Sequence, residues 1–343
     1  MTTIPSEPLA DDVRDLPAIY TWSFHSEAFA DVRSMVAEYE RPVSLSVVNS
    51  TYKRPDQTAE MVDSIRESVE RFYRRYPEDH IEFECLVCCP ADDRETVRRL
   101  RSMDWDPLRV LTTDAVTITG KRDAGIEAAE NEYIVSIDSD CVAEDNWVES
   151  IHRSIKKHWF PGAIQGAYYL DYPPDRNWYT RYESNRDKSR FRAGQADSRN
   201  LVYRKDVYES IGGFNTESRY ADVAEDNLLR KRITDLGAGF VMDRTIRVRH
   251  RYPVTLADNL KRFQYFGTGD HYVKEYSEEA YRNHYTPWVK WRQLLSKRPT
   301  LGELNSSEGV SLRRWAFRFL QLCAYTLGYL QGLYIYNKEK ISA

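Results

Sequence analysis

The sequence predicts an α/β fold, in which a Rossmann-like, mostly parallel β-sheet is flanked by helices and followed by a helical C-terminal extension. Strand-like and helix-like patterns alternate between residues 43 and 252, as they do in βαβ units. The apolar run at 133–137 has the composition of a strand that is buried on both faces. We therefore expect three parts: an N-terminal extension (1–40), an α/β domain (41–252) and a helical region (253–343).

Composition narrows the function classes. The 343 residues suffice for one large domain with appendages or for two domains. The 49 basic and 53 acidic side chains give a formal net charge of -4, which argues against nucleic acid as a partner. None of the five cysteines belongs to the spaced pairs of a zinc site, so we expect reduced thiols. The N-terminus is acidic and has no apolar core, which predicts a cytoplasmic protein.

The elements follow from local patterns taken in chain order. Apolar runs bounded by turn residues predict strands at 43–48, 81–88, 109–111, 133–137, 162–170 and 198–203. A last short strand is expected directly before Val248. Apolar residues at helical spacing predict helices that begin at Pro55, Arg94, Ile126, Trp147, Lys205 and Glu225. Asp145 is expected to cap the fourth of these helices, and the segment 119–125 to form a turn. The aperiodic segments 171–192 and 215–224 read as loops that cover a site.

Two carboxylates follow the buried strand at 133–137. Asp138 and Asp140 are separated only by Ser139, and the carboxyl end of such a strand is where open α/β sheets bind ligands. Two acids at that position repel each other unless a cation lies between them, and a hard divalent cation with oxygen ligands fits. An acid-x-acid triplet alone is more often a solvated turn, so the other clusters decide its meaning.

Three further clusters admit both a structural and a functional interpretation. Lys121 and Arg122 form a solvated first turn or hold phosphate oxygens. Glu225 and Asp226 are ordinary dipole partners at a helix start, or one of them is a general base. His250 is a packed histidine, or its imidazole completes a metal site together with the acid-x-acid turn.

In their order along the chain, these clusters resemble the family 2 glycosyltransferases of the GT-A fold. The resemblance covers residues 43–252. It is carried by the acid-x-acid turn with C-V-A-E-D-N-W at 141–147, by Y-R-K-D-V-Y-E-S-I-G-G-F at 203–214, and by E-D-N-L-L-R-K-R at 225–232, which is similar to the family pattern E-D-x-x-L-x-x-R. The resemblance implies metal-dependent, inverting transfer of a sugar from a nucleotide-diphosphate donor to an acceptor hydroxyl.

The resemblance also implies a role for each cluster. Asp138 and Asp140 correspond to ligands of the metal and of the donor diphosphate, with Asp140 expected to be the closer metal ligand. His250 corresponds to the further metal ligand of many members. Asp226 corresponds to the catalytic base, and Glu225 to an acceptor-binding or orienting group. The implied cofactor is Mg²⁺ or Mn²⁺.

The nucleotide-binding segments depart from the family pattern at two places. The turn after the first strand reads S-T-Y-K at 50–53 instead of P-T-Y-N, and the acid after the second strand lies in C-C-P-A-D-D at 88–93 instead of V-D-D-G-S. Either of the two acids at 92 and 93 is expected to face the base. The expected donor-binding residues are Thr51, Tyr52, Arg54, Asp92, Asp93, Lys121, Arg122 and Asp138.

The helical region contains a run of 19 residues without formal charge, 319–337, flanked by basic residues. Three alternatives remain: a helix packed on the domain, a helix that spans the bilayer, and a peripheral membrane contact through 311–340 on the cytoplasmic face. The third fits a glycan or lipid-linked acceptor. The G-x-x-x-G spacing of Gly328 and Gly332 is common by chance and carries little weight.

Two other functions share features of this sequence. A nucleotidyltransferase also uses a strand-end acid and a metal, but 49–55 lacks the glycine-rich phosphate-binding signature that such an enzyme needs. A non-catalytic sugar-binding protein on the same fold is the other alternative. Both remain open from the residues alone.

Overall fold

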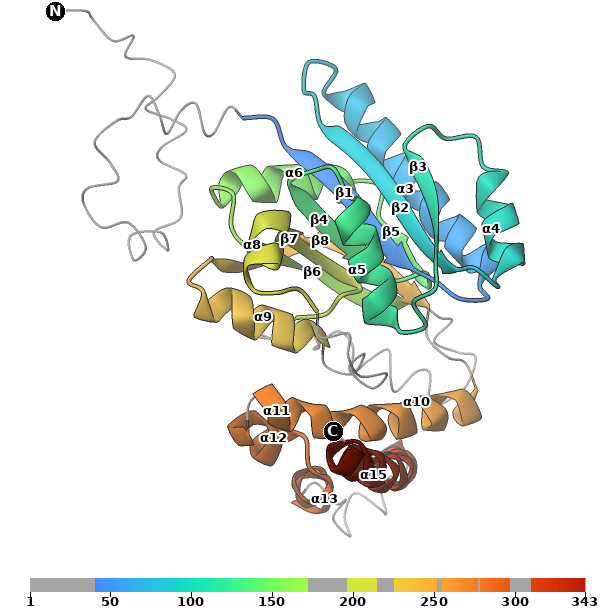
Figure 1. Cartoon of the computed structure of the whole chain (residues 1–343), viewed down its shortest axis with the longest axis vertical. Helices are drawn as coiled ribbons and strands as arrows, with labels where there is room; N and C mark the ends of the chain where they lie inside the picture. Colours follow the sequence, from blue (N-terminus) through green and yellow to red (C-terminus); the bar gives the residue numbers. More distant parts are fainter. Residues whose placement is uncertain are drawn as a thin grey trace, which may run out of the picture.

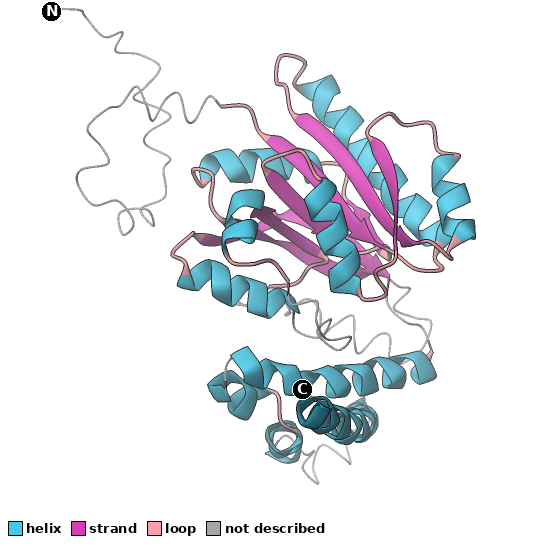
Figure 2. Ribbon diagram, viewed as in Figure 1, coloured by secondary structure: helices cyan, strands magenta, loops and turns pink. Residues whose placement is uncertain are grey.

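The computed structural model describes residues 41–171, 196–214, 225–251, 255–276, 278–296 and 310–342. One eight-stranded sheet forms the centre, with helices on both faces and a group of C-terminal helices beside it (Figures 1 and 2). The strands are β1 (Ser44–Ser50), β2 (Glu82–Pro90), β3 (Leu108–Thr113), β4 (Tyr133–Ile137), β5 (Cys141–Ala143), β6 (Ala163–Asp171), β7 (Asn200–Arg204) and β8 (Phe240–Arg251). The N-terminal extension and most of the two predicted site-covering loops lie outside the described residues.

The strands are ordered β3-β2-β1-β4-β7-β6-β8-β5. The first four run parallel, so their carboxyl ends meet at one edge of the sheet. The remaining half is mixed, because β7 is antiparallel to both β4 and β6 whereas β6 and β8 are parallel. Every residue of β4 is buried, as its continuous apolar run predicts. The predicted α/β class with a mostly parallel sheet is confirmed.

Helices cover the two faces of the sheet and bury two apolar clusters. On one face lie α3 (Pro55–Arg75), α4 (Arg94–Arg101) and α6 (Trp147–Lys157). On the other face lie α5 (Ile118–Ala128), α8 (Lys205–Ser210) and α9 (Glu225–Asp235). Helix α3 begins at Pro55 as predicted, since the fixed φ of proline suits a first turn.

Three local predictions were wrong. Helix α5 begins at Ile118, so the segment expected to be a turn is helical, and Thr117 caps it by accepting a hydrogen bond from the Gly120 amide (3.0 Å). Asp145 does not cap α6, because the N-cap position belongs to Asn146 and the exposed Asp145 side chain pairs with Arg71 at 3.4 Å. The last strand is not short, since β8 has 12 residues, and β5 was not predicted at all.

The helical region comprises α10 (Leu256–Gly269), a 3₁₀ turn (Asp270–Tyr272), α11 (Val273–Tyr276), α12 (Glu278–His284), α13 (Pro287–Ser296) and α15 (Val310–Ser342). Helix α10 lies between the sheet and α15 (Figure 1). None of the helices in the described parts of the chain combines the length and the apolar character that crossing a membrane requires. Packing of α15 against α10 is what the structure shows.

Two glycines of α15 allow close contact with α10, a role that their spacing alone did not indicate. A Cβ atom on Gly328 would lie 1.9 Å from the Gln264 carbonyl oxygen, and one on Gly332 would lie 2.2 Å from that of Thr268. Both carbonyls belong to α10, so the two helices approach until their backbones touch. The G-x-x-x-G pattern is therefore the seam of the α10–α15 contact, and the low weight given to it was wrong.

Candidate active site

The acid-x-acid turn is held in place by three strands. The Ile137 carbonyl at the end of β4 accepts a hydrogen bond from Asn49 Nδ2 of β1 (2.7 Å). The Cys141 amide closes the turn onto the Asp138 carbonyl (3.0 Å), and the Arg251 amide of β8 donates to the Asp140 carbonyl (2.8 Å). The backbone beneath both carboxylates is therefore fixed by hydrogen bonds to its neighbours.

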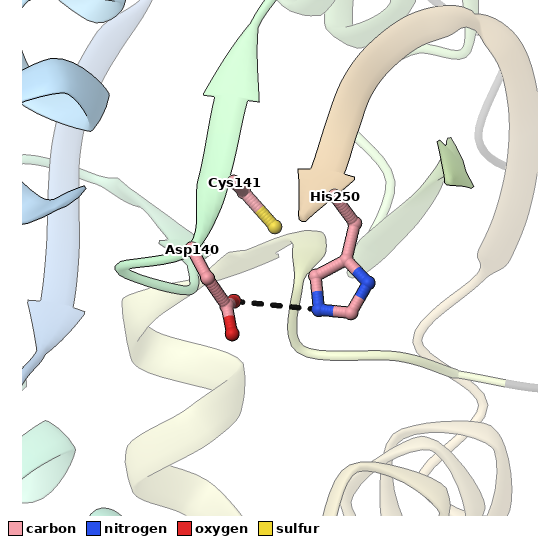
Figure 3. Close-up of side chains that lie close together, drawn as sticks. All are labelled: Asp140, Cys141 and His250. Atoms are coloured by element: carbon pink, nitrogen blue, oxygen red, sulfur yellow. Dashed lines mark ion pairs between the residues drawn. The ribbon is translucent and has the colours of Figure 1, made fainter. Parts of the chain in front are cut away.

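Pairing of β5 with β8 brings the turn to His250. Cys141 lies opposite His250 in the antiparallel register, and Asp140 Oδ1 lies 3.4 Å from His250 Nε2 (Figure 3). Burial lowers the pKa of His250, which leaves its imidazole neutral at neutral pH. Burial opposes ionisation of Asp140 as well, but His250, Arg54 and Arg262 outweigh that effect and lower its pKa below the ordinary value.

This cluster has the features of a site for a divalent cation. Asp140 Oδ1 is buried and accepts no hydrogen bond from the described residues. Oxygen and imidazole nitrogen together suit Mg²⁺ or Mn²⁺. Cys141 Sγ lies within the same cluster, but burial raises the pKa of its thiol far above the usual range, and a protonated thiol is a poor ligand.

Asp138 faces a different partner from Asp140. Arg122 Nη2 lies 2.6 Å from Asp138 Oδ1, and Nη1 of the same guanidinium lies 2.9 Å from Glu225 Oε1. The Arg122 side chain is only 3% exposed, so this bridge joins the end of β4 to the start of α9 from inside the molecule. Lys121 is buried too, and its Nζ donates to the Thr51 carbonyl (3.3 Å). The alternative of a solvated first turn was therefore wrong.

Glu225 and Asp226 are both attached to the segment that precedes β7. Ser198 donates from its amide to Asp226 Oδ2 (3.3 Å) and from its hydroxyl to Glu225 Oε1 (3.2 Å). Asp226 Oδ1 accepts from the Asn227 amide (2.7 Å). Burial, the neighbouring Glu225 and then Asp197 raise the pKa of Asp226 well above its ordinary value. The Asp226 carboxylate therefore binds a proton more readily than an ordinary aspartate.

The loop after β1 and the acids after β2 form a second group of predicted residues. Asp93 is buried: its Oδ2 accepts from the Lys53 amide (2.5 Å) and its Oδ1 from the Thr96 amide at the start of α4 (3.3 Å). The Lys53 backbone has φ 53°, a conformation uncommon outside glycine, and the bond to Asp93 holds it there. Asp92 is exposed. Of the two acids, Asp93 is occupied by the loop and Asp92 faces solvent.

The loop itself divides its side chains between the interior and the solvent. Thr51 is buried, and its hydroxyl bonds to that of Thr58 (2.8 Å), so it supports the loop from within. Tyr52 is 44% exposed, and the ammonium of Lys53 lies 4.7 Å from the centre of its ring. Arg54 Nη1 reaches across to Asp140 Oδ2 at 2.9 Å. The first strand thus connects directly to the acid-x-acid turn.

Sequence reasoning missed Asp197 and Arg199, which lie just before β7. Arg199 pairs with Asp197 through two hydrogen bonds, one of them Nε to Oδ1 at 2.5 Å, and its guanidinium lies 3.9 Å from the centre of the Tyr168 ring. Because β7 is antiparallel to β4, the start of β7 lies beside the end of β4, with Asn200 opposite Ile137. The only signal was the polar run A-D-S-R-N at 196–200 before a buried strand.

The chain is similar in sequence and in fold to known glycosyltransferases. The profile of glycosyl transferase family 2 matches residues 46–212. Among solved structures, the fold is similar to that of the mannosyltransferase PcManGT from Pyrobaculum calidifontis in complex with GDP-Man and Mn²⁺, with a TM-score of 0.58 and 18% sequence identity. That match covers 85% of this chain and 88% of the other. A search of curated proteins finds no significant match.

The sheet, its flanking helices and the acidic edge define a GT-A glycosyltransferase fold. The chain belongs to glycosyl transferase family 2, whose profile spans the strands and helices from β1 to the end of α8.

Proposed function

We propose that this glycosyltransferase moves a sugar from a nucleotide-diphosphate donor to an acceptor hydroxyl with inversion at the anomeric carbon. One observation carries the proposal: the Asp140–His250 pair and Asp226, whose pKa is raised, lie at the carboxyl edge of a family 2 domain. The complex of the similar mannosyltransferase with GDP-Man and Mn²⁺ supports the donor class.

Asp140 and His250 would hold the cation, and Asp138 would complete the site through its oxygen that does not face Arg122. A bound Mg²⁺ or Mn²⁺ supplies positive charge that offsets the negative charge of the departing nucleoside diphosphate. Arg122 balances the charges of Asp138 and Glu225, so that it positions these carboxylates. Tyr52 and Asp92 are the exposed side chains suited to the nucleotide base.

In the reaction, the acceptor oxygen attacks the anomeric carbon and the bond from that carbon to the diphosphate oxygen breaks. Asp226 takes the hydroxyl proton as the new bond forms, and the bonding pair leaves with the nucleoside diphosphate. Ser198 and Asn227 keep the Asp226 carboxylate in one orientation. Attack from the face opposite the leaving group inverts the anomeric centre.

Donor binding tests the proposal. We expect one of a panel of nucleotide sugars, GDP-mannose included, to raise the melting temperature when Mn²⁺ is present and to lose this effect when a chelator is added. Asp140→Ala removes the carboxylate beside His250, so we expect the shift to disappear. Asp145→Ala, which removes an exposed aspartate five residues away, is the matched control and keeps the shift. A shift that survives in Asp140→Ala would contradict the cation site.

We further propose that the outer face of α15 rests on an anionic lipid surface where the acceptor is presented. Arg313, Leu320, Leu327 and Tyr334 recur every seven residues and are all exposed, with Leu327 and Tyr334 at 53% and 71%. The exposed Lys338 follows one turn later. A second copy in either orientation would set cation against cation at the ends of this stripe, whereas anionic headgroups match both ends.

Sedimentation with vesicles tests the membrane proposal. We expect the protein to bind vesicles that contain phosphatidylglycerol more strongly than pure phosphatidylcholine, and Leu327→Asp to weaken that binding about tenfold, because it places a charge in the apolar stripe. Leu236→Asp alters an equally exposed leucine after α9 and serves as the control. Equal binding by Leu327→Asp and the wild type would rule out this face.

A further inference from the structure

The backbone of Arg54 is held by hydrogen bonds, whereas its long side chain is partly exposed to solvent. Its carbonyl accepts hydrogen bonds from the Thr58 amide (3.0 Å) and the Thr58 hydroxyl (2.7 Å), which anchor the residue directly before α3. Its side chain is 46% exposed. A long side chain on an anchored backbone can change its partner without any change in the fold.

The guanidinium of Arg54 contacts the carboxylate group that would hold the cation. Arg54 Nη1 is 2.9 Å from Asp140 Oδ2 and 3.4 Å from the Ser139 hydroxyl, while Asp140 Oδ1 faces His250. A divalent cation on this carboxylate and a guanidinium in contact with it repel each other strongly at such distances. Each therefore weakens the hold of the other on Asp140.

Three other cations beside the turn are held by partners in the interior. Lys121 is bonded to the Thr51 carbonyl, Arg122 to Asp138 and Glu225, and Arg199 to Asp197. Each of these pairs is largely buried and therefore costly to break. The Arg54–Asp140 pair is partly exposed, and pairs of that kind contribute little to stability. Arg54 can therefore leave the turn at small cost.

We propose that Arg54 is an exchangeable counter-ion of Asp140, which competes with the divalent cation and moves onto the donor diphosphate when that cation binds. The inference rests on the proposed cation site and donor class. It gives the site a binding order: the cation displaces Arg54 from Asp140, and the released guanidinium then pairs with phosphate oxygens, for which its forked geometry is suited. Without the cation, Arg54 stays on the carboxylate and donor binding is weak.

Titration with Mn²⁺ alone, by calorimetry and by electron paramagnetic resonance of the unbound ion, tests the competition. Arg54→Ala should bind Mn²⁺ about three- to tenfold more tightly than the wild type, because a competing positive charge is gone. With Mn²⁺ saturating, the same variant should bind the nucleoside diphosphate of the selected donor about tenfold more weakly, since it lacks a charge-assisted hydrogen bond.

Two further variants separate the competition from a general effect of charge. Arg74→Ala removes an exposed arginine from the last turn of the same helix, and both affinities should stay at the wild-type values. Arg54→Lys keeps the competing charge but not the fork, so Mn²⁺ affinity should stay close to wild type while nucleotide affinity falls. Together, these results would show that both the position of Arg54 and the forked geometry of its guanidinium are needed.

The outcomes distinguish this inference from the proposed function. If Arg54→Ala binds Mn²⁺ no more tightly than the wild type, while His250→Ala abolishes binding, the exchange is overturned and the cation site stands. If Mn²⁺ binds neither the wild type nor Arg54→Ala, both the site and the exchange fall. Unchanged nucleotide affinity in Arg54→Ala would overturn the transfer of Arg54 to the diphosphate.

Discussion

Asp226 is a carboxylate whose surroundings oppose its ionisation. The sequence suggested a role as base for Asp226, and in the structure burial, Glu225 and then Asp197 oppose its ionisation. These surroundings raise its pKa, and a raised pKa makes the ionised form a stronger proton acceptor. The enclosure that makes Asp226 difficult to ionise therefore also suits it to the proposed role.

This raised pKa predicts the pH dependence of transfer. Asp226 accepts a proton only when ionised, so kcat/KM should rise with pH through its pKa, at a pH above the ordinary aspartate value of about 3.9. Glu225→Gln removes a nearby negative charge, which lowers the pKa of Asp226 and should move the rising limb to lower pH. A pH–rate profile of both proteins checks this, and a limb that stays in place would show that another group controls the rate.

Strand pairing creates the contacts between site residues that the sequence motifs do not predict. The roles of Asp140 and His250 were inferred from a resemblance, but their contact depends on the unpredicted strand β5 and its register with β8. Asp197 and Arg199 reach the site only because β7 is antiparallel to β4. Periodicity identifies a strand and says nothing of its neighbour or direction, so these contacts could not be derived from the residues.

At the scale of elements, α5 and α9 are connected by a buried ion pair in addition to the apolar cluster that they share. Arg122 of α5 bridges the strand end that carries Asp138 and the helix start that carries Glu225. Its burial was missed because two adjacent basic residues near glycines favour a solvated turn by composition. The capping threonine at 117 was the available signal that the helix begins earlier.

The α10–α15 seam combines backbone contact with buried polar bonds. Gln321 Nε2 donates to Asn259 Oδ1 (2.8 Å), and Tyr329 gives its carbonyl to the His271 ring (2.7 Å). Lys290 pairs with the buried Asp270 at 2.9 Å, and the Tyr325 hydroxyl donates to the same carboxylate. A helix that buries such groups against its neighbour is positioned by them, which explains why α15 packs although its run of uncharged residues is long.

Close contact of α10 and α15 at Gly328 predicts that alanine at this position destabilises the protein, although alanine favours a helix more than glycine does. Gly328→Ala should gain about 1 kcal/mol from propensity but lose more, because its Cβ would lie 1.9 Å from the Gln264 carbonyl oxygen. We expect the midpoint of thermal unfolding to fall by roughly 5 °C. Gly239→Ala, whose Cβ would meet only Pro161 at 3.9 Å, is the control and should not fall. An unchanged midpoint in Gly328→Ala would mean that the two backbones are not in contact.

At the scale of the whole molecule, the alternation of strands and helices predicted the class of the fold, and the ordered motifs predicted the family. The sequence did not show that the helical region borders the site. Arg262 of α10 lies close enough to contribute to the lowered pKa of Asp140. Burial, Asp270 and then Asp226 raise the pKa of Tyr285, which follows α12, to about 12. Contacts of this kind join segments more than 50 residues apart, which no local pattern encodes.

In the proposed reaction, Asp226 takes the proton of the attacking hydroxyl while the cation site binds the donor. The most direct test compares Asp226→Asn with the wild type for nucleoside diphosphate release, with Mn²⁺ and the selected donor, and for donor affinity by calorimetry. We predict that release falls at least about 100-fold and that affinity changes less than about threefold. Asp235→Asn, at the exposed far end of α9, should turn over normally. Wild-type release by Asp226→Asn would contradict the account.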